Sequence, residues 1–285
     1  VGADGNSVVL KQSDVTSDGA VTLRDSGETV LLEAKESEHE LRINNLPAKP
    51  VVSFLREFSA PVKVSHQRDA EEVAFLVEHD TDGFVRWDAM QTLWMEHFDT
   101  NINATVDPVA TLGGLAKGAL ALETPEQQML AATMLAVPNE NYLFEQLRGF
   151  DVDALLDARD AAVENAAQAH VQTWEALVAM HDSGQAYQAD ASGMARRALG
   201  NTAFSYLAKT QTGAVLEELL QTRYAKADNL TDRRTVLAIA CRHTGVSEAF
   251  KDSLLEDFYQ AWKDYALSLI HISEPTRPRL SSYAV

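Results

Sequence analysis

The hydrophobic pattern of the chain changes its period near residue 66, and this change limits the fold to two dissimilar parts. Before it, short apolar runs at Val8–Leu10, Thr29–Leu32 and Leu41–Ile43 are separated by Asp-Gly, Ser-Gly and Asn-Asn turns. Apolar runs with such turn residues between them predict short antiparallel strands. Because the strands are so few, residues 1–66 are expected to form only part of an antiparallel β-sandwich.

After residue 66 the apolar residues recur at helical spacing. Asp69 with Glu72 forms a capping-box pattern, and Thr124-Pro125 with Gln127 marks a second helix start. Two apolar stripes are read directly from the sequence: Phe84, Trp87, Met90, Trp94 and Phe98, and then Val246, Phe250, Leu254, Phe258 and Trp262. The same reasoning predicts further helices at 139–149, 151–183, 190–209, 211–226, 231–242 and 247–264.

Helices with single apolar stripes and short polar loops are typical of antiparallel pairs that stack on one another. No fixed-period repeat is present, so an irregular superhelix of the armadillo or HEAT kind is expected over residues 67–266. The predicted fold class is therefore α+β and mostly α. The segment 267–285 resembles a translated sequencing-library adapter and is expected to be a non-native tail.

Composition narrows the function further. The formal net charge is −18, which opposes binding to nucleic acid and to anionic membranes. The single cysteine, Cys241, excludes an internal disulfide, and its apolar helical context predicts a small buried side chain. The chain has no basic and apolar leader and no run of eighteen apolar residues, so we expect a cytoplasmic location. Its first residue, Val1, is not methionine, so a leader lost upstream stays open.

Candidate metal and nucleotide sites are weak. The nearest approach to a His-Glu-x-x-His zinc motif begins at His39-Glu40, but Ile43 stands in the place of the second histidine. His79 with Asp80 and Asp82 is better interpreted as an acidic helix C-terminus with a solvated histidine than as a metal site. The remaining histidines are scattered singly along the chain. They are His66, His97, His170, His181, His243 and His271. Of these, His97 is expected to cap a helix end.

Two further patterns receive structural interpretations. The glycine-rich run Gly113–Gly118 follows no strand, so a loop or a helix break is expected there instead of a phosphate site. Asn103-Ala104-Thr105 and Asn229-Leu230-Thr231 match the glycosylation pattern by accident, and Thr231 is expected to cap a helix.

Several blocks resemble one family in the same order. They are Arg56–Val64 (Arg-Glu-Phe-Ser-Ala-Pro-Val-Lys-Val), Phe84–Gln91, Arg197–Asn201, Ala227–Asp232, and Phe258-Tyr259 with Trp262. Together they resemble the C-terminal part of bacterial aminopeptidase N, a zinc exopeptidase of the gluzincin class. The resemblance covers roughly residues 1–266. It implies that 1–66 is the second half of the immunoglobulin-like domain and that 67–266 begins the helical superhelix.

The resemblance also implies where the chemistry lies. The zinc ion of the family belongs to a catalytic domain that this chain lacks, and the family's Gly-x-Met-Glu-Asn motif is missing as well. The chain is therefore expected to hold no catalytic, cofactor or metal site. Its expected partners are the missing catalytic domain and, through it, peptide substrates.

Arg86, Trp87 and Asp88 have two interpretations. In the first, they line a chamber above the active site of the complete enzyme. In the second, which is favoured, they pack at the seam between the two domains. The function of the whole chain also has two interpretations. In the first, the chain is a non-catalytic scaffold that limits a peptidase to short peptides. In the second, it is a free-standing helical module that binds a protein partner on its concave face.

Overall fold

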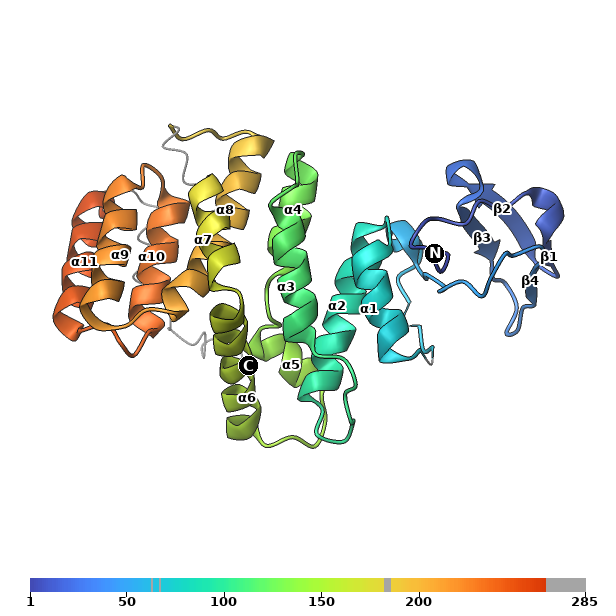
Figure 1. Ribbon diagram of the computed structural model, residues 1–285, viewed down its shortest axis with the longest axis horizontal. Coiled ribbons are helices and arrows are strands. Elements are labelled where there is room, and N and C mark those ends of the chain that lie inside the picture. The colour runs from blue at the N-terminus through green and yellow to red at the C-terminus, as the bar shows by residue number, and fades with distance from the viewer. Residues whose placement is uncertain (63, 67, 182–185, 265–285) are drawn as a thin grey trace, which may run out of the picture. The chain divides into compact units, whose positions relative to one another are not determined.

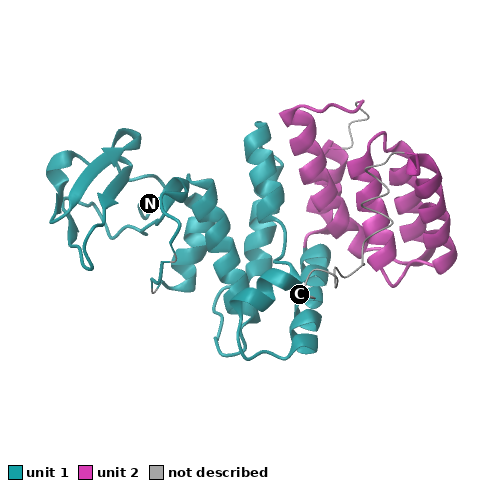
Figure 2. Cartoon of the chain, turned by 180° about the vertical axis from the view of Figure 1, so that it is seen from behind, with its two compact units in different colours: residues 1–169 teal, residues 170–285 magenta. Residues whose placement is uncertain are grey.

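The computed structural model describes residues 1–62, 64–66, 68–181 and 186–264. The chain divides into two compact units, residues 1–169 and 170–285 (Figure 2). In the first unit a β-rich segment precedes the helices (Figure 1). That segment contains three short 3-10 turns and four strands, η1(Gln12–Asp14), β1(Val15–Ser17), β2(Ala20–Arg24), η2(Asp25–Gly27), β3(Thr29–Glu33), β4(Leu41–Ile43) and η3(Arg56–Phe58).

The strands form two antiparallel pairs. β1 pairs with β4, Val15 opposite Ile43, and β2 pairs with β3, Ala20 opposite Glu33. The predicted strands at 29–32 and 41–43 are found, but the one at Val8–Leu10 is wrong. There the Leu10 N–H donates to the carbonyl of Gly27 at 2.9 Å, across a turn in which Gly27 has a φ of 100°. This positive φ and the close approach to Leu10 exclude a larger residue.

The β-rich segment is a partial sandwich with an open interior. A hollow of about 360 Å³ lies against it. Apolar residues of β3, β4 and the following segment line the hollow, among them Val30, Leu32, Leu41, Ile43 and Val51. Across the four strands the one buried residue is Val15 of β1, and it is still 9% exposed. Too few strands are present to close a core.

Helices make up the rest of the described chain. The first unit continues with α1(Ala70–His79), α2(Gly83–Phe98), α3(Pro108–Ala119), α4(Pro125–Met134), α5(Glu140–Gln146) and α6(Val152–Ala169). The second unit contains α7(Val171–His181), α8(Ala191–Lys209), α9(Gly213–Lys226), α10(Leu230–Arg242) and α11(Glu248–Trp262). Within the described residues, every helix is too short or too polar to cross a bilayer.

The two predicted stripes lie in the cores. On α2, Met90, Trp94 and Phe98 are buried, and Trp94 stacks on Phe98 with ring centroids 5.6 Å apart. On α11, Leu254 and Phe258 are buried in the core of the second unit, and Phe250 and Trp262 pack against it. Burial of a large apolar side chain stabilises the fold by about 1.5–3 kcal/mol, so these stripes fix which helix faces turn inward.

One predicted capping box forms and the other does not. Thr124 Oγ1 accepts from the Gln127 N–H at 3.3 Å, and the Gln127 side chain reaches back to the Thr124 N–H. Asp69 is also an N-cap, but its side chain makes no cap hydrogen bond. Glu72 instead pairs with Lys49 at 2.8 Å. A tertiary ion pair has replaced the local interaction.

Two predictions about the helical region are wrong, one about where a helix ends and one about a helix break. The region 151–183 is two helices, α6 and α7, because each half has its own core: Ala162 and Ala166 are buried in α6, while Trp174 of α7 stacks on Tyr206 of α8 at 4.4 Å. The glycine-rich run 113–118 is helical, within α3. Asp107 caps this helix, Pro108 stands in its first turn, and its buried Leu112 and Ala116 supply the apolar face that outweighs the glycines.

Candidate functional site

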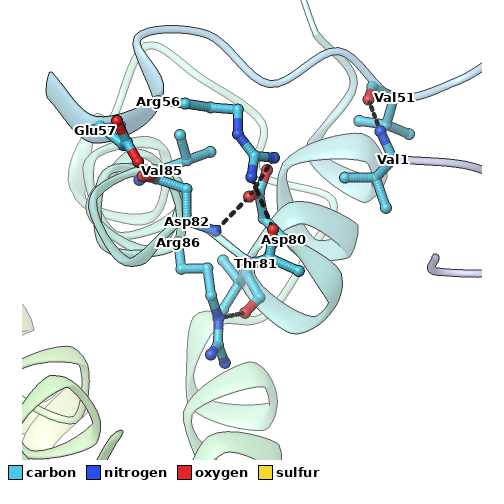
Figure 3. A network of polar contacts seen from close by, with 10 residues as sticks. Val1, Val51, Arg56, Glu57, Asp80, Thr81, Asp82, Val85 and Arg86 are labelled. Atoms are coloured by element: carbon cyan, nitrogen blue, oxygen red, sulfur yellow. Dashed lines mark hydrogen bonds and ion pairs between the residues drawn. The ribbon is translucent and has the colours of Figure 1, made fainter. Parts of the chain in front are cut away.

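The clearest cluster of polar contacts joins the β-rich segment to the first two helices (Figure 3). Arg56, in the turn η3, reaches the end of α1. Its Nη1 lies 3.4 Å from Asp80 Oδ1, and its Nη2 donates to Thr81 Oγ1 at 2.8 Å. The sequence indicated an acidic helix end at this place. The structure adds that the Asp80 side chain is buried, at 0% exposed.

Asp82 makes the second connection. It is the N-cap of α2, and its Oδ1 accepts from the Val85 N–H at 2.9 Å. Its Oδ2 accepts from the Glu57 N–H at 2.7 Å. Glu57 has a positive φ of 56°, and Leu55 and Phe58 in the same turn also have positive φ values. One carboxylate thus holds both the start of a helix and a strained turn from the preceding segment. We call Arg56, Glu57, Asp80, Thr81 and Asp82 the joint.

At the centre of the joint lies the buried carboxylate of Asp80. Asp80 Oδ1 also accepts from the Asp82 N–H at 2.7 Å, whereas Oδ2 is buried and has no hydrogen-bond partner among the described residues. A buried charge of this kind depends on its ionic partner, and removing that partner is costly. Arg56 is that partner. The arrangement holds two segments together and offers no reactive group to a substrate.

An aromatic row runs beside the joint. Phe58 meets Phe84 at 5.1 Å, Phe84 meets Trp87 at 6.3 Å, and Trp87 meets Tyr142 of α5 at 6.3 Å. Arg86 lies on another side of α2, and its Nε–H donates to the Val77 carbonyl at 2.9 Å. Asp88 is exposed. Of the three residues singled out in the sequence, Arg86 and Trp87 contact other helices of the first unit.

His39 has no nitrogen available for a metal. Its Nε2 accepts from the Lys35 and Glu36 N–H groups at 3.0 and 3.1 Å. Nδ1 is therefore the protonated nitrogen, and it donates to Asp18 Oδ1 at 3.2 Å. Among the described residues, no group of three or more His, Cys, Asp or Glu side chains could hold a metal ion. His271 lies outside the described residues, as does the segment 267–285.

The other histidines occupy separate places. His66 lies beside Phe54 at 5.0 Å, and His79 lies beside Phe75 at 4.4 Å. His97, on the last turn of α2, meets Trp94 edge to face at 5.9 Å. His170, between α6 and α7, lies 6.5 Å from Trp174. His243 Nδ1 accepts from the Gly245 N–H at 3.0 Å.

Two expectations about single residues are wrong. Cys241 is exposed, because the buried residues of α10 are Val236, Leu237 and Ala240 and the cysteine falls outside their face. Thr231 does not cap α10. Asn229 is the N-cap, and its Oδ1 accepts from the Asp232 N–H at 3.0 Å. Its Nδ2 donates to Asp232 Oδ2 at 2.7 Å.

The structure brings together two sequence blocks that lie far apart in the chain. Asn201, at the end of the block Arg197–Asn201, donates through Nδ2 to Asp232 Oδ1 at 2.8 Å, at the end of the block Ala227–Asp232. Arg223 Nη2 donates to Asn201 Oδ1 at 3.1 Å. Asn201 is buried, so the bond fixes α8 against α10. The sequence identified both blocks but gave no sign that they touch.

The fold is thus an immunoglobulin-like part followed by armadillo-type helices, and family models divide the chain in the same way. A model described as a domain of unknown function (DUF3458) with an Ig-like fold matches residues 8–67. A model described as a domain of unknown function (DUF3458_C) with ARM repeats matches residues 70–270, more than half of the chain. The chain therefore belongs to this family, the C-terminal part of bacterial aminopeptidase N.

Individual relatives are consistent with this family assignment. Aminopeptidase N of Caulobacter vibrioides is 30% identical over 265 residues, 90% of this chain and 29% of the relative. Aminopeptidase N of Escherichia coli K12 is 25% identical over 243 residues, 83% of this chain and 27% of the relative. The solved structure of Legionella pneumophila aminopeptidase A, in complex with aspartic acid, has a TM-score of 0.68 at 20% identity and covers 88% of this chain and 30% of its own, which shows the fold alone. The chain spans less than a third of the length of each.

Proposed function

We propose that this chain is the non-catalytic C-terminal scaffold of a zinc-dependent aminopeptidase that removes N-terminal residues from peptides. In this role the helices cover the catalytic chamber and limit entry to short peptides. The likeness to proteins named aminopeptidase N supports the reaction class. Coverage of less than a third of those relatives supports the division of labour, with the chemistry in polypeptide outside this chain.

The zinc ion would be held by that other polypeptide. The one segment that approaches a zinc motif, at His39, has both ring nitrogens engaged in hydrogen bonds. A catalytic zinc site needs three protein ligands and an open position. The described residues provide no such set.

The observation that carries the scaffold role is the joint. A roof over a chamber needs a fixed angle between the part that is attached to the catalytic domain and the helices that cover it. Arg56 with Asp80 and Glu57 with Asp82 connect the β-rich segment to α1 and α2 through buried or directed contacts. A flexible tether would carry none of them.

The charge of the chain adds a second element to the proposal. At −18 the surface would attract the α-ammonium group that every peptide substrate presents, and it would raise the local substrate concentration. Such steering weakens with ionic strength. The KM of the complete enzyme for short peptides is therefore expected to rise with salt more than its kcat changes.

The complete reading frame provides the first test. A His-Glu-x-x-His helix encoded upstream of residue 1 supports the proposal. A start codon with a ribosome-binding site directly before residue 1 would instead identify a free-standing helical module that binds a protein partner. Whether the chain is a peptidase scaffold or a free-standing module, we expect the isolated chain neither to bind zinc stoichiometrically nor to cleave an alanyl substrate.

The second test separates the roof from the chemistry. In the complete enzyme, cleavage of a tripeptide is compared with cleavage of an exposed N-terminal alanine on a folded protein, with and without residues 67–266. We expect the preference for the tripeptide to fall when these helices are removed, at equal zinc content. An unchanged preference would refute the chamber role and leave the family assignment intact.

A further inference from the structure

A cavity of about 410 Å³ lies among the first four helices, and no residue of the joint lines it. Small and apolar side chains form most of its wall. They are Ala74 and Val77 of α1, Ala110, Leu115 and Ala119 of α3, and Leu130, Ala131 and Met134 of α4. A volume and lining of this kind are typical of sites for small organic ligands.

Arg86 brings a guanidinium to this wall. Its Nε–H is bonded to the Val77 carbonyl at 2.9 Å, which fixes the side chain while the two Nη groups remain. Figure 3 shows the guanidinium directed away from Arg56 and Asp80. No carboxylate of the described residues forms an ion pair with it. Burial lowers the pKa of Arg86 below its ordinary value, with Asp80 opposing this in part. The guanidinium is therefore partly desolvated and forms no ion pair with the described residues, while Asp80 offsets part of its charge.

Glu78 is the other charged residue at the wall, and it does not neutralise Arg86. Its side chain is 77% exposed, and its Oε2 lies 3.7 Å from His79 Nε2. An exposed carboxylate is screened by water, so it contributes little to the potential inside the cavity. Gln127, also at the wall, is engaged in the capping box with Thr124. Arg86 is therefore the buried cation at this wall, and Asp80 offsets its charge only in part.

Two glycines keep the cavity open. Gly114 and Gly118 lie one helical turn apart on α3, and a Cβ at either position would meet nothing within 4 Å. Each costs about 1 kcal/mol of helix stability relative to alanine. No neighbouring segment needs the space that their missing side chains leave, so the cost has no packing explanation.

We propose that this cavity binds a small monocarboxylate with an apolar body, whose carboxylate pairs with the Nη groups of Arg86 and whose apolar part fills the space beside Gly114. Two sources offer this chemistry, the carboxyl-terminal residue of a peptide and a straight-chain fatty acid. The inference stands on the cavity and on Arg86, and it does not depend on the peptidase role. A guanidinium and a carboxylate form two parallel hydrogen bonds, which provides both affinity and orientation.

Calorimetric titration of the 285-residue chain tests this proposal with three probes: N-acetyl-leucine, its neutral amide N-acetyl-leucinamide, and octanoate. We expect at least one of the two acids to bind, and the amide to bind about tenfold or more weakly than N-acetyl-leucine if that acid is the ligand. Binding of N-acetyl-leucine identifies a peptide end, whereas binding of octanoate alone identifies a fatty acid.

Variants locate the binding. Arg86→Gln should weaken it by about tenfold or more. Arg159→Gln is the matched control, because Arg159 also donates through Nε to a backbone carbonyl, that of Pro138 at 2.8 Å, but does not line the cavity. Gly114→Leu should abolish binding by filling the space. Lys117→Leu, exposed on the same helix, should not.

If Arg86→Gln fails to fold, the comparison of Gly114→Leu with Lys117→Leu still tests the proposal, because leucine in place of a helical glycine favours the helix. Helical content measured by circular dichroism shows that each variant is folded. The proposal is overturned if neither acid binds at millimolar concentration, if the amide binds as well as its acid, or if a folded Gly114→Leu chain binds as the parent does.

Discussion

Arg56 and Asp80 lie 24 positions apart in the sequence and 3.4 Å apart in the structure, and their contact connects the β-rich segment to the first helix pair. The carboxylate is 0% exposed and the guanidinium side chain 17%. A pair so buried is a weak source of net stability but a strong constraint, because either member alone is a desolvated charge. The joint therefore governs how firmly the two segments are connected.

Neutralising Asp80 tests this constraint. Asp80→Asn keeps the size of the side chain but leaves Arg56 without its counter-ion, and we expect a loss of about 2–3 kcal/mol in the free energy of unfolding. Urea denaturation measures it. Glu78→Gln, two positions away and exposed, should change stability by less than about 0.5 kcal/mol. Equal effects of the two substitutions would show that the pair is unimportant.

The capping of α10 gives a second prediction. Asn229→Ala removes the acceptor of the Asp232 N–H and a donor to the Asp232 carboxylate, so we expect a loss of about 1–2 kcal/mol. Thr231→Ala should cost less than about 0.5 kcal/mol, since the cap is Asn229. Thermal unfolding of both variants compares them. A larger effect at Thr231 would restore the interpretation drawn from the sequence.

Two glycines should respond in opposite ways to alanine. A Cβ at Gly200 would lie 2.9 Å from His181 Cβ, where α8 meets α7. Overpacking of this kind costs about 1–3 kcal/mol and should outweigh the gain in helix propensity. At Gly114 there is open space, so Gly114→Ala should stabilise the chain by about 0.5–1 kcal/mol. Denaturant midpoints report both signs, and stabilisation at Gly200 would contradict the packing.

His181 makes stability depend on pH in a predictable direction. Burial, and then the charges of Arg196 and Arg223, hold its pKa below the ordinary 6.5. Its Nε2 is buried and has no hydrogen-bond partner among the described residues. The unfolded chain takes up this proton near pH 6.5 while the folded chain does not, so the folded state loses stability as pH falls below 6.5. The decrease should be smaller in His181→Gln between pH 7.5 and 5.5. Identical pH profiles would remove His181 as its source.

Local patterns were sufficient for much of the helical part. Thr124-Pro125 with Gln127 predicted a helix start because a cap and a proline act within one turn, and the stripe from Val246 to Trp262 predicted a buried face because helical spacing alone places these residues on one side. The motif blocks likewise predicted the family, since a residue order is visible without a structure.

Tertiary contacts decided the rest. β1 and β2 were not predicted, because neither contains a run of apolar residues and both form strands by pairing with β4 and β3. The sequence showed Asp80 only as part of an acidic helix end, whereas the structure buries its carboxylate beside Arg56, which comes from a distant turn. The glycine-rich run became part of α3 because neighbouring helices cover its apolar face. Turns, caps and stripes depend on residues a few positions apart, whereas burial and charge pairing depend on which distant segments meet, and only the folded chain brings those together.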